Sequence, residues 1–116
     1  MNGQLICEIM KLIDIGKDFS DTPLGRYPED GPFSGERFRE EFLCPALKEH
    51  GSATVVIDGT EGYGSSFLDE AFGGLVRKGY YTAQQLKKIL KIECNDADYS
   101  IYRDLVWKYI NEARAK

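Results

Sequence analysis

The sequence predicts an α/β sandwich in which a mixed, partly parallel β-sheet packs against helices. Segments rich in β-branched residues alternate along the chain with segments whose apolar residues recur at helical spacing. The clearest strand, at 53–58, has three consecutive β-branched apolar residues at 55–57, which is typical of a central parallel strand buried on both faces. The 116 residues suit one domain, and we expect it to span 1–116.

The chain begins with a predicted strand over 5–13, for which a hairpin at 14–16 is one continuation. A loop follows over 20–35, because its prolines and glycines prevent a regular element of useful length. Loops of this length in small domains are usually either functional or disordered. The aromatic residues Tyr27 and Phe33 are candidates to hold this loop against the surface.

A helix is predicted over 35–50. Ser34 suits its N-cap, Pro45 should kink or interrupt it, and Gly51 should end it. The residues expected on its apolar face are Phe38, Phe42, Ala46 and Leu47.

A polar, glycine-bearing loop at 59–65 follows the central strand and leads into a second amphipathic helix. Ser66 and Asp69 match a capping box at the start of this helix. The glycine pair at 73–74 costs about 1 kcal/mol per residue relative to alanine, which predicts the close approach of another backbone. The residues expected on the apolar stripe are Phe67, Leu68, Ala71, Phe72, Leu75 and Val76.

The last third of the chain predicts a short helix, a strand and a final helix. Thr82 and Gln85 form a capping box that opens the short helix, and the strand covers 90–94. Asn95 or Asp96 is expected to cap the final helix. Its apolar side is expected to carry Ile101, Leu105, Tyr109 and Ala113, with Tyr102, Val106 and Ile110 adjoining.

Charge and hydropathy exclude several classes of partner. The formal net charge is −4, and the lysines at 87, 88 and 91 are interpreted as one solvated helix face, so we expect no nucleic-acid binding. No apolar run is long enough to cross a bilayer, and the first residues do not resemble a signal peptide, so we expect a cytoplasmic protein without a membrane partner.

The chain offers few residues for metal binding or catalysis. The three cysteines, Cys7, Cys44 and Cys94, have no metal-ligand spacing and are expected to be reduced thiols, and the single histidine, His50, suits a helix end. Ser65, Ser66 and Tyr63 are candidate nucleophiles without a convincing base, so we expect no enzyme and no cofactor. Four carboxylates are interpreted as a solvated acidic rim, with a divalent-cation site as the alternative: Asp58, Glu61, Asp69 and Glu70.

Two groups of short motifs resemble a known family. The first group is Gly25-Arg26-Tyr27, Asp30-Gly31, Ser34-Gly35-Glu36 and Phe38-Arg39, and the second is the continuous run Ser66-Phe67-Leu68-Asp69-Glu70-Ala71-Phe72-Gly73. Their combination is similar to the STAS-like family of unknown function DUF4325, which is related to the STAS antagonists of anti-sigma factors. The resemblance extends over most of the chain, from about residue 5 to 113.

The resemblance implies a possible site of regulation. In STAS antagonists an ATPase-type kinase phosphorylates the second of two adjacent hydroxyl residues at a helix start, which corresponds here to Ser66, with Ser65 beside it. Gly64 stands where those proteins have an acid, and Phe67 where they have a glycine. The alternative is that Ser66 only caps the helix.

These observations lead to the hypothesis of a STAS-like regulatory module that binds a protein partner. The resemblance implies a histidine-kinase-like ATPase as the partner, and a homodimer stays open. One alternative is an inhibitor or interaction protein of a phage or mobile element without a phosphoswitch, and another is a small nucleotide-binding or enzymatic domain. The residues expected to contact a partner are Arg26, Tyr27, Asp30, Arg39, Gly64, Phe67 and Asp69.

Overall fold

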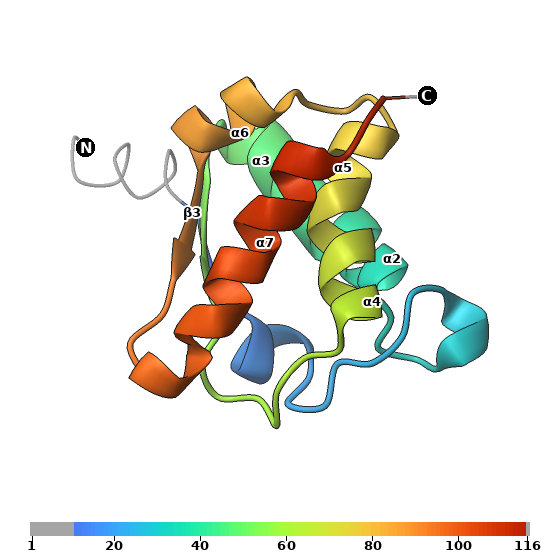
Figure 1. The fold of residues 1–116 in the computed structure, drawn as a ribbon, viewed down its shortest axis with the longest axis vertical. Coiled ribbons are helices and arrows are strands. Elements are labelled where there is room, and N and C mark those ends of the chain that lie inside the picture. Colours follow the sequence, from blue (N-terminus) through green and yellow to red (C-terminus); the bar gives the residue numbers. More distant parts are fainter. Residues whose placement is uncertain (1–10, 116) are drawn as a thin grey trace.

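The computed structural model describes residues 11–115, which contain a three-stranded parallel sheet at one side of the helices (Figure 1). The strands are β1 (Lys11–Asp14), β2 (Ala53–Val56) and β3 (Leu90–Glu93), in the spatial order β1-β2-β3. The predicted α/β class is therefore confirmed, and the strand predicted to be central is the central one. Residues 5–10 of the first predicted strand and Cys7 lie outside the described residues.

The hairpin considered after the first strand is wrong. Ile15–Phe19 instead forms a single wide helical turn after β1. The Asp14 carboxylate accepts a hydrogen bond from the Lys17 backbone N–H at 3.2 Å, and Ser20 N–H donates to the Ile15 carbonyl at 2.8 Å. A residue with a side-chain acceptor before a turn favours this local closure over a strand reversal.

Two continuous helices each contain a π-helical turn. The first consists of α2 (Gly35–Phe38), the π turn Arg39–Leu43 and α3 (Cys44–His50). Ser34 caps it through Arg37 N–H, and Gly51 ends it at a φ of +77°, both as predicted. The predicted interruption at Pro45 takes the form of the π turn just before it. Proline clashes with the carbonyl of an ordinary preceding turn, and a wider turn relieves that clash.

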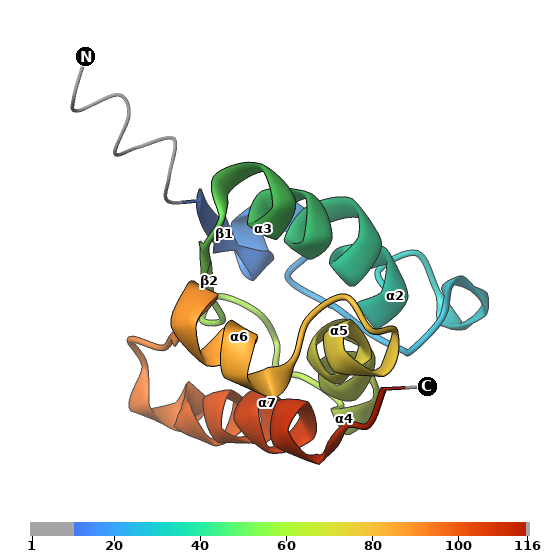
Figure 2. The same cartoon turned by 90° about the horizontal axis from the view of Figure 1, so that it is seen from above.

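The second continuous helix consists of α4 (Ser65–Leu68), the π turn Asp69–Gly73 and α5 (Gly74–Arg77). All six residues predicted for its apolar stripe are buried. This helix lies between the α2–α3 helix and α7 (Ser100–Glu112), as the two views show (Figure 2). The π turns of the two helices contact each other, which brings Arg39 beside Glu70.

The predicted cap of the short helix is confirmed, whereas the predicted cap of the final helix belongs to a short turn before it, and Tyr99 is the N-cap of α7. Thr82 and Gln85 form both bonds of a capping box at the start of α6 (Ala83–Ile89). Asp96 accepts from Asp98 N–H at 2.9 Å and caps the short turn that leads into α7.

The predicted apolar side of the last helix is partly wrong. Ile101 is 61% exposed, whereas Val106 and Ile110 are fully buried. The reason is that α7 packs against the π turn Asp69–Gly73, so the residues facing that turn, and not Ile101, enter the core.

Gly35 allows the two long helices to approach each other closely. A Cβ atom at Gly35 would lie 2.6 Å from the Phe67 carbonyl oxygen and 3.0 Å from the Ala71 nitrogen. Below this contact lies a layer of aromatic rings, with Phe38 and Phe67 fully buried and their ring centroids 6.1 Å apart. The close contact fixes the second long helix, and therefore its first residues, against the start of the first. Among residues 11–115 no helix is long and apolar enough to span a membrane.

Candidate functional site

The backbone passes from the central strand to an exposed helix start through a glycine-bearing loop. After β2, Ile57 N–H still donates to the Glu93 carbonyl at 3.1 Å, and the loop then leads to Gly64, the N-cap of α4. The Tyr63 hydroxyl donates to the Ile57 carbonyl at 2.8 Å, which ties the loop back to the strand end. Ligands of open α/β sheets commonly bind at this carboxyl end of the strands.

Ser65 and Ser66 lie exposed in the first turn of α4. Neither hydroxyl makes a hydrogen bond with any other residue of the described chain. The predicted capping box is wrong, because Gly64 is the N-cap and the Asp69 carboxylate binds two arginines instead. Within the described chain, the serines therefore present free hydroxyls at a helix N-terminus.

Asp69, one turn after these serines, is held between two arginines. Arg26 Nη1 lies 2.8 Å from Asp69 Oδ2, and Arg77 Nη1 lies 3.0 Å from Asp69 Oδ1. Burial alone would raise the pKa of Asp69, but the hydrogen bonds from Arg26 and Arg77 more than offset it and hold that pKa below its usual range. Asp69 is therefore a fixed, ionised anchor for the loop that carries Arg26.

Glu70 continues this network into the interior. Its side chain is only 7% exposed, and Oε2 accepts from Arg39 Nη1 at 2.8 Å while Oε1 lies 3.3 Å from Arg26. Arg39 is completely buried, and its Nε also donates to Glu40 at 2.8 Å. Arg39 Nη1 further donates to the backbone carbonyl of Glu70, inside the π turn. We call the set Arg26, Arg39, Asp69, Glu70 and Arg77 the arginine network.

The glycine pair 73–74 makes room for this network. A Cβ atom at Gly74 would lie 2.1 Å from Arg39 Nη1, and one at Gly73 would lie 2.8 Å from Asp69 Oδ1. The predicted close approach is thus real. The nearest atoms belong to charged side chains, and the backbone carbonyl oxygen of Tyr109 in α7 would also lie 3.4 Å from a Cβ atom at Gly73. The sequence did contain a signal of this network. One amphipathic helix carries both an acidic pair and two adjacent glycines, and the other amphipathic helix carries an arginine next to its apolar face.

The loop over 20–35 is ordered by its own hydrogen bonds. Asp30 Oδ2 accepts from the backbone N–H groups of Arg26 and Tyr27, each at 3.0 Å. The carbonyls of Gly25 and Arg26 accept from the N–H groups of Gly35 and Glu36, at 2.9 and 3.0 Å. The first turn of α2 is therefore capped by the loop, and the Arg26 side chain is aimed at the second helix.

The residues expected to contact a partner divide into exposed and buried ones. Arg39 and Phe67 are fully buried, so the prediction that they contact a partner directly is wrong. Arg39 is needed to neutralise Glu70, and Phe67 belongs to the aromatic layer. The other five are exposed or half-buried. Hydrogen bonds of the loop bring four of them together, namely Arg26, Tyr27, Asp30 and Asp69, and the fifth, Gly64, lies at the start of α4.

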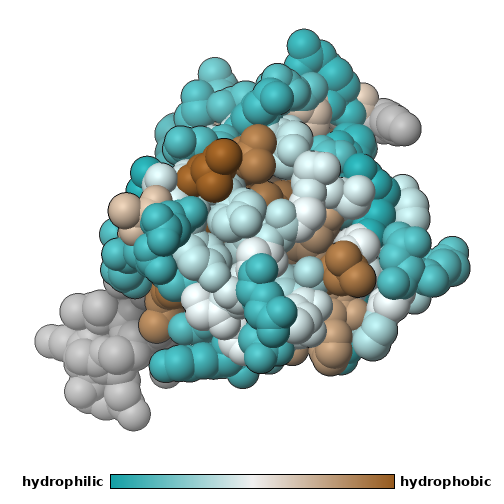
Figure 3. All heavy atoms as spheres, turned by 60° about the horizontal axis from the view of Figure 1, so that its bottom comes forward, coloured by the Kyte–Doolittle hydropathy of each residue, from teal (hydrophilic) through white to brown (hydrophobic). Residues whose placement is uncertain are grey.

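A shallow hollow of about 360 Å³ lies beside the exposed serines. Its lining includes Leu24, Tyr63, Gly64 and Tyr102, and Leu24 is 64% exposed. Figure 3 brings this end of the molecule forward and shows separate apolar patches among polar side chains. Exposed apolar side chains rimmed by polar ones are typical of protein-contact surfaces.

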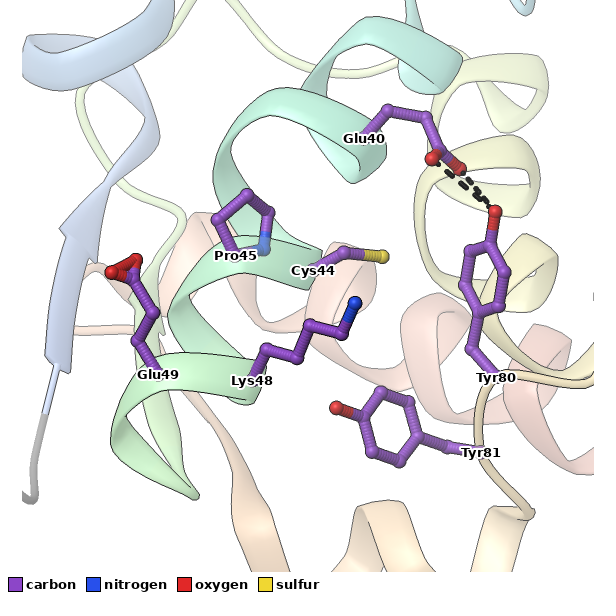
Figure 4. A pocket seen from close by; sticks show the side chains of 7 residues that line it. All are labelled: Glu40, Cys44, Pro45, Lys48, Glu49, Tyr80 and Tyr81. Atoms are coloured by element: carbon purple, nitrogen blue, oxygen red, sulfur yellow. Dashed lines mark hydrogen bonds between the residues drawn. The ribbon is translucent and has the colours of Figure 1, made fainter.

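A second hollow, of about 560 Å³, was missed by sequence reasoning (Figure 4). Its lining combines Cys44 and Lys48 of α3 with Tyr80 and Tyr81, which lie far away in the sequence. The Tyr80 hydroxyl donates to Glu40, and this bond joins the wall of the hollow to the arginine network. Burial raises the pKa of Cys44 to about 11, so the thiol in this wall is protonated at neutral pH.

The four carboxylates considered as a cation site are separated in the structure. Asp58 accepts from the backbone N–H groups of Asn95 and Asp96, whereas Asp69 and Glu70 bind arginines. Across residues 11–115, no group of three or more histidine, cysteine or acidic residues is arranged to hold a metal ion. The divalent-cation alternative does not fit these contacts. The interpretation as a solvated acidic rim is wrong for Glu70, which is buried, and for Asp69, which two arginines hold.

Comparison with known proteins identifies the family but no individual relative. No curated protein and no solved structure matches the chain. A family model described as a STAS-like domain of unknown function, DUF4325, matches residues 34–99, which is more than half of the chain. The match contains both long helices and the π turns that hold Arg39 and Glu70, whereas Arg26 lies outside it. The chain therefore belongs to the STAS-like family DUF4325.

Proposed function

We propose that this chain is a regulatory module that binds a protein partner, and that phosphorylation of Ser66 switches the binding. The observation that carries the proposal is the free, exposed hydroxyl of Ser66 in the first turn of a helix that the arginine network fixes in place. Helix-start N–H groups and the helix dipole stabilise an added phosphate.

The ion pairs of Asp69 and Glu70 reduce the repulsion that this acidic pair would exert on a phosphate at Ser66. Asp69 and Glu70 would repel a phosphate on Ser66 if they were unpaired, because residues three and four apart lie on one helix face. Both are instead paired with arginines, Asp69 with Arg26 and Arg77, and Glu70 with Arg39. The local charge is therefore close to balanced before any phosphate is added.

This arrangement also provides a way in which a phosphate on Ser66 would change the protein surface. Arg26 is 32% exposed and belongs to the loop, so it is the arginine of the network that can change partners most easily. A phosphate on Ser66 would compete with Asp69 for Arg26, because a guanidinium binds phosphate oxygens in the same paired geometry. Release of Arg26 from Asp69 would move the loop with Tyr27 and change the surface offered to the partner.

Binding rather than catalysis is the better account of the candidate nucleophiles. The Tyr63 hydroxyl is held by the Ile57 carbonyl, and burial raises its pKa. Cys44 is a protonated thiol at neutral pH. Ser65 and Ser66 have no hydrogen-bonded base among the described residues.

The partner class that we propose is a histidine-kinase-like ATPase, on the ground of the resemblance to the STAS antagonists of anti-sigma factors. The test is to incubate the chain with ATP and an ATPase of this class that is encoded beside its gene, and to measure the intact mass and the site of modification. We expect one phosphate on Ser66 and none on the Ser66→Ala variant, with Ser65→Ala as the matched control that is still modified.

Partner affinity then tests the switch separately from the modification. We expect the unmodified and the Ser66-phosphorylated chains to differ in affinity for that ATPase by at least about tenfold, a typical size for the effect of a phosphate at an interface. Equal affinity of both forms and of Ser66→Glu would contradict the switch, and absence of any binding would contradict the interaction itself.

A further inference from the structure

A hollow rimmed by four lysines lies at the end of the sheet opposite Ser66. Its volume is about 530 Å³, and its rim contains Lys11, Lys87, Lys88 and Lys91, all of them exposed. The three strands are parallel, so they all begin at this end, and the start of β1 is thereby placed close to the end of α6 and the start of β3. The prediction of one solvated helix face is wrong, because Lys91 lies on β3 and Lys11 joins from β1.

The lysines of this rim form no ion pair with any acidic residue of the described chain. Every ion pair shorter than 4 Å that forms within residues 11–115 uses an arginine, and none uses a lysine. The chain as a whole is acidic, with a formal net charge of −4, so the rim is a local reversal of charge. Like charges gathered in this way repel one another, and binding of an anion relieves that repulsion.

The lining of the hollow is mixed in character. Beside the lysines it includes the polar residues Ser52 and Thr54 and two half-buried apolar side chains, Ile89 and Trp107, the latter being the chain's single tryptophan. Half-buried apolar side chains beside a cationic rim match a ligand that has both apolar side chains and negative charges. A nucleic-acid strand suits it less well, because its backbone would extend from the rim across the surface of an acidic protein.

We propose that this lysine hollow binds an acidic protein segment that carries apolar side chains between its carboxylates. Electrostatic attraction brings the segment to the rim, and burial of its apolar side chains against Trp107 holds it. This inference does not depend on the function proposed for Ser66, because the two surfaces lie at opposite ends of the parallel strands.

Trp107 provides the measurement, because its fluorescence reports directly on the hollow. The full chain is titrated at low salt with a synthetic peptide of alternating glutamate and leucine, and binding is followed by Trp107 emission and by anisotropy of the labelled peptide. We expect saturable binding, and the triple variant Lys87→Gln, Lys88→Gln, Lys91→Gln should weaken it by about tenfold.

A second triple variant controls for net charge. Lys17, Lys48 and Lys78 are exposed lysines outside the hollow, and their change to glutamine alters the net charge equally. This variant should bind the peptide as the wild type does. The proposal is overturned if the peptide changes neither signal, if both triple variants lose binding equally, or if oligothymidylate of equal charge binds more tightly than the peptide. The last result would assign the hollow to nucleic acid.

Discussion

The two ends of the parallel sheet use their positive charges in opposite ways. At the carboxyl end, Arg26, Arg39 and Arg77 are all paired with Asp69 or Glu70 and join the loop and the two long helices. At the amino end, the lysines of the hollow have no acidic partner within residues 11–115. Guanidinium groups bind carboxylates in a fixed, forked geometry, whereas ammonium groups stay hydrated. The comparison indicates that arginines join the elements of this fold, whereas the lysines of the hollow take no part in its ion pairs within the described residues.

The largest expected effect is at Arg39. Arg39→Met keeps much of the buried volume but leaves the buried Glu70 carboxylate without its main partner, and we expect a loss of about 3–5 kcal/mol in the free energy of unfolding. Urea denaturation followed by circular dichroism measures this. Lys88→Met at the other end is the control and should change stability by less than about 0.5 kcal/mol. Equal effects of the two variants would remove the distinction between the ends.

Substitution of Gly74 tests whether the arginine network needs the space that a glycine leaves at this position. Gly74→Ala places a methyl group on the Arg39 guanidinium, and we expect a loss of about 1–3 kcal/mol from overpacking and a weakened ion pair. Gly64→Ala is the matched control, because no atom lies within 4 Å of the position that the added methyl group would take, and its φ of −81° suits any residue. Thermal unfolding of both variants checks this, and a Gly74→Ala chain as stable as Gly64→Ala would contradict the geometry.

Arg26 should contribute less, and in a pH-dependent way. Arg26→Gln removes a half-exposed pair with Asp69, for which we expect a loss of about 1 kcal/mol at neutral pH. The folded-state pKa of Asp69 is lowered, so its contribution is present above the unfolded-state pKa of about 4 and is lost as pH falls through the folded value. The stability difference between wild type and Arg26→Gln should therefore narrow below about pH 4. A difference that stays constant down to about pH 2 would show that Asp69 is not the partner concerned.

The smallest effect on stability is expected at the lysine hollow. The triple change of Lys87, Lys88 and Lys91 to glutamine removes no ion pair within the described chain, and we expect a change within about 0.5 kcal/mol, toward higher stability at low salt as repulsion falls. Urea denaturation at two salt concentrations measures it. A loss of more than about 1 kcal/mol would show that these lysines are structural.

Elements with strong local signals could be predicted from the sequence. The β-branched run at 55–57 identified the central strand, and the Thr82–Gln85 box and Ser34 identified two helix starts. These features depend on contacts within a few residues, which a sequence displays directly. The position of Ser66 in the first turn of a helix was predictable for the same reason, although the capping residue was Gly64.

The pairing within the arginine network was not predicted, because its partners are far apart in the chain and the glycine pair was the only signal of a close approach that the sequence analysis used. Arg39 and Glu70 are 31 residues apart and meet only where two π turns touch. An arginine next to Phe38 and Glu40 looks like an ordinary surface residue of an amphipathic helix, yet its side chain is wholly buried. The lysine hollow was missed for the same reason. Lys11 and Lys91 lie on the two outer strands, and only the order of the strands in the sheet brings them to the same hollow.

We propose that a phosphate on Ser66 takes Arg26 from Asp69 and releases the loop. Hydrogen exchange measured by mass spectrometry on a chain with phosphoserine at position 66 tests this proposal without any partner. We expect faster exchange at the backbone N–H groups of Leu24, Arg26, Gly35 and Glu36, with α7 unchanged and the Ser66→Ala chain equal to wild type. Exchange in the loop that is identical with and without the phosphate would rule the proposal out.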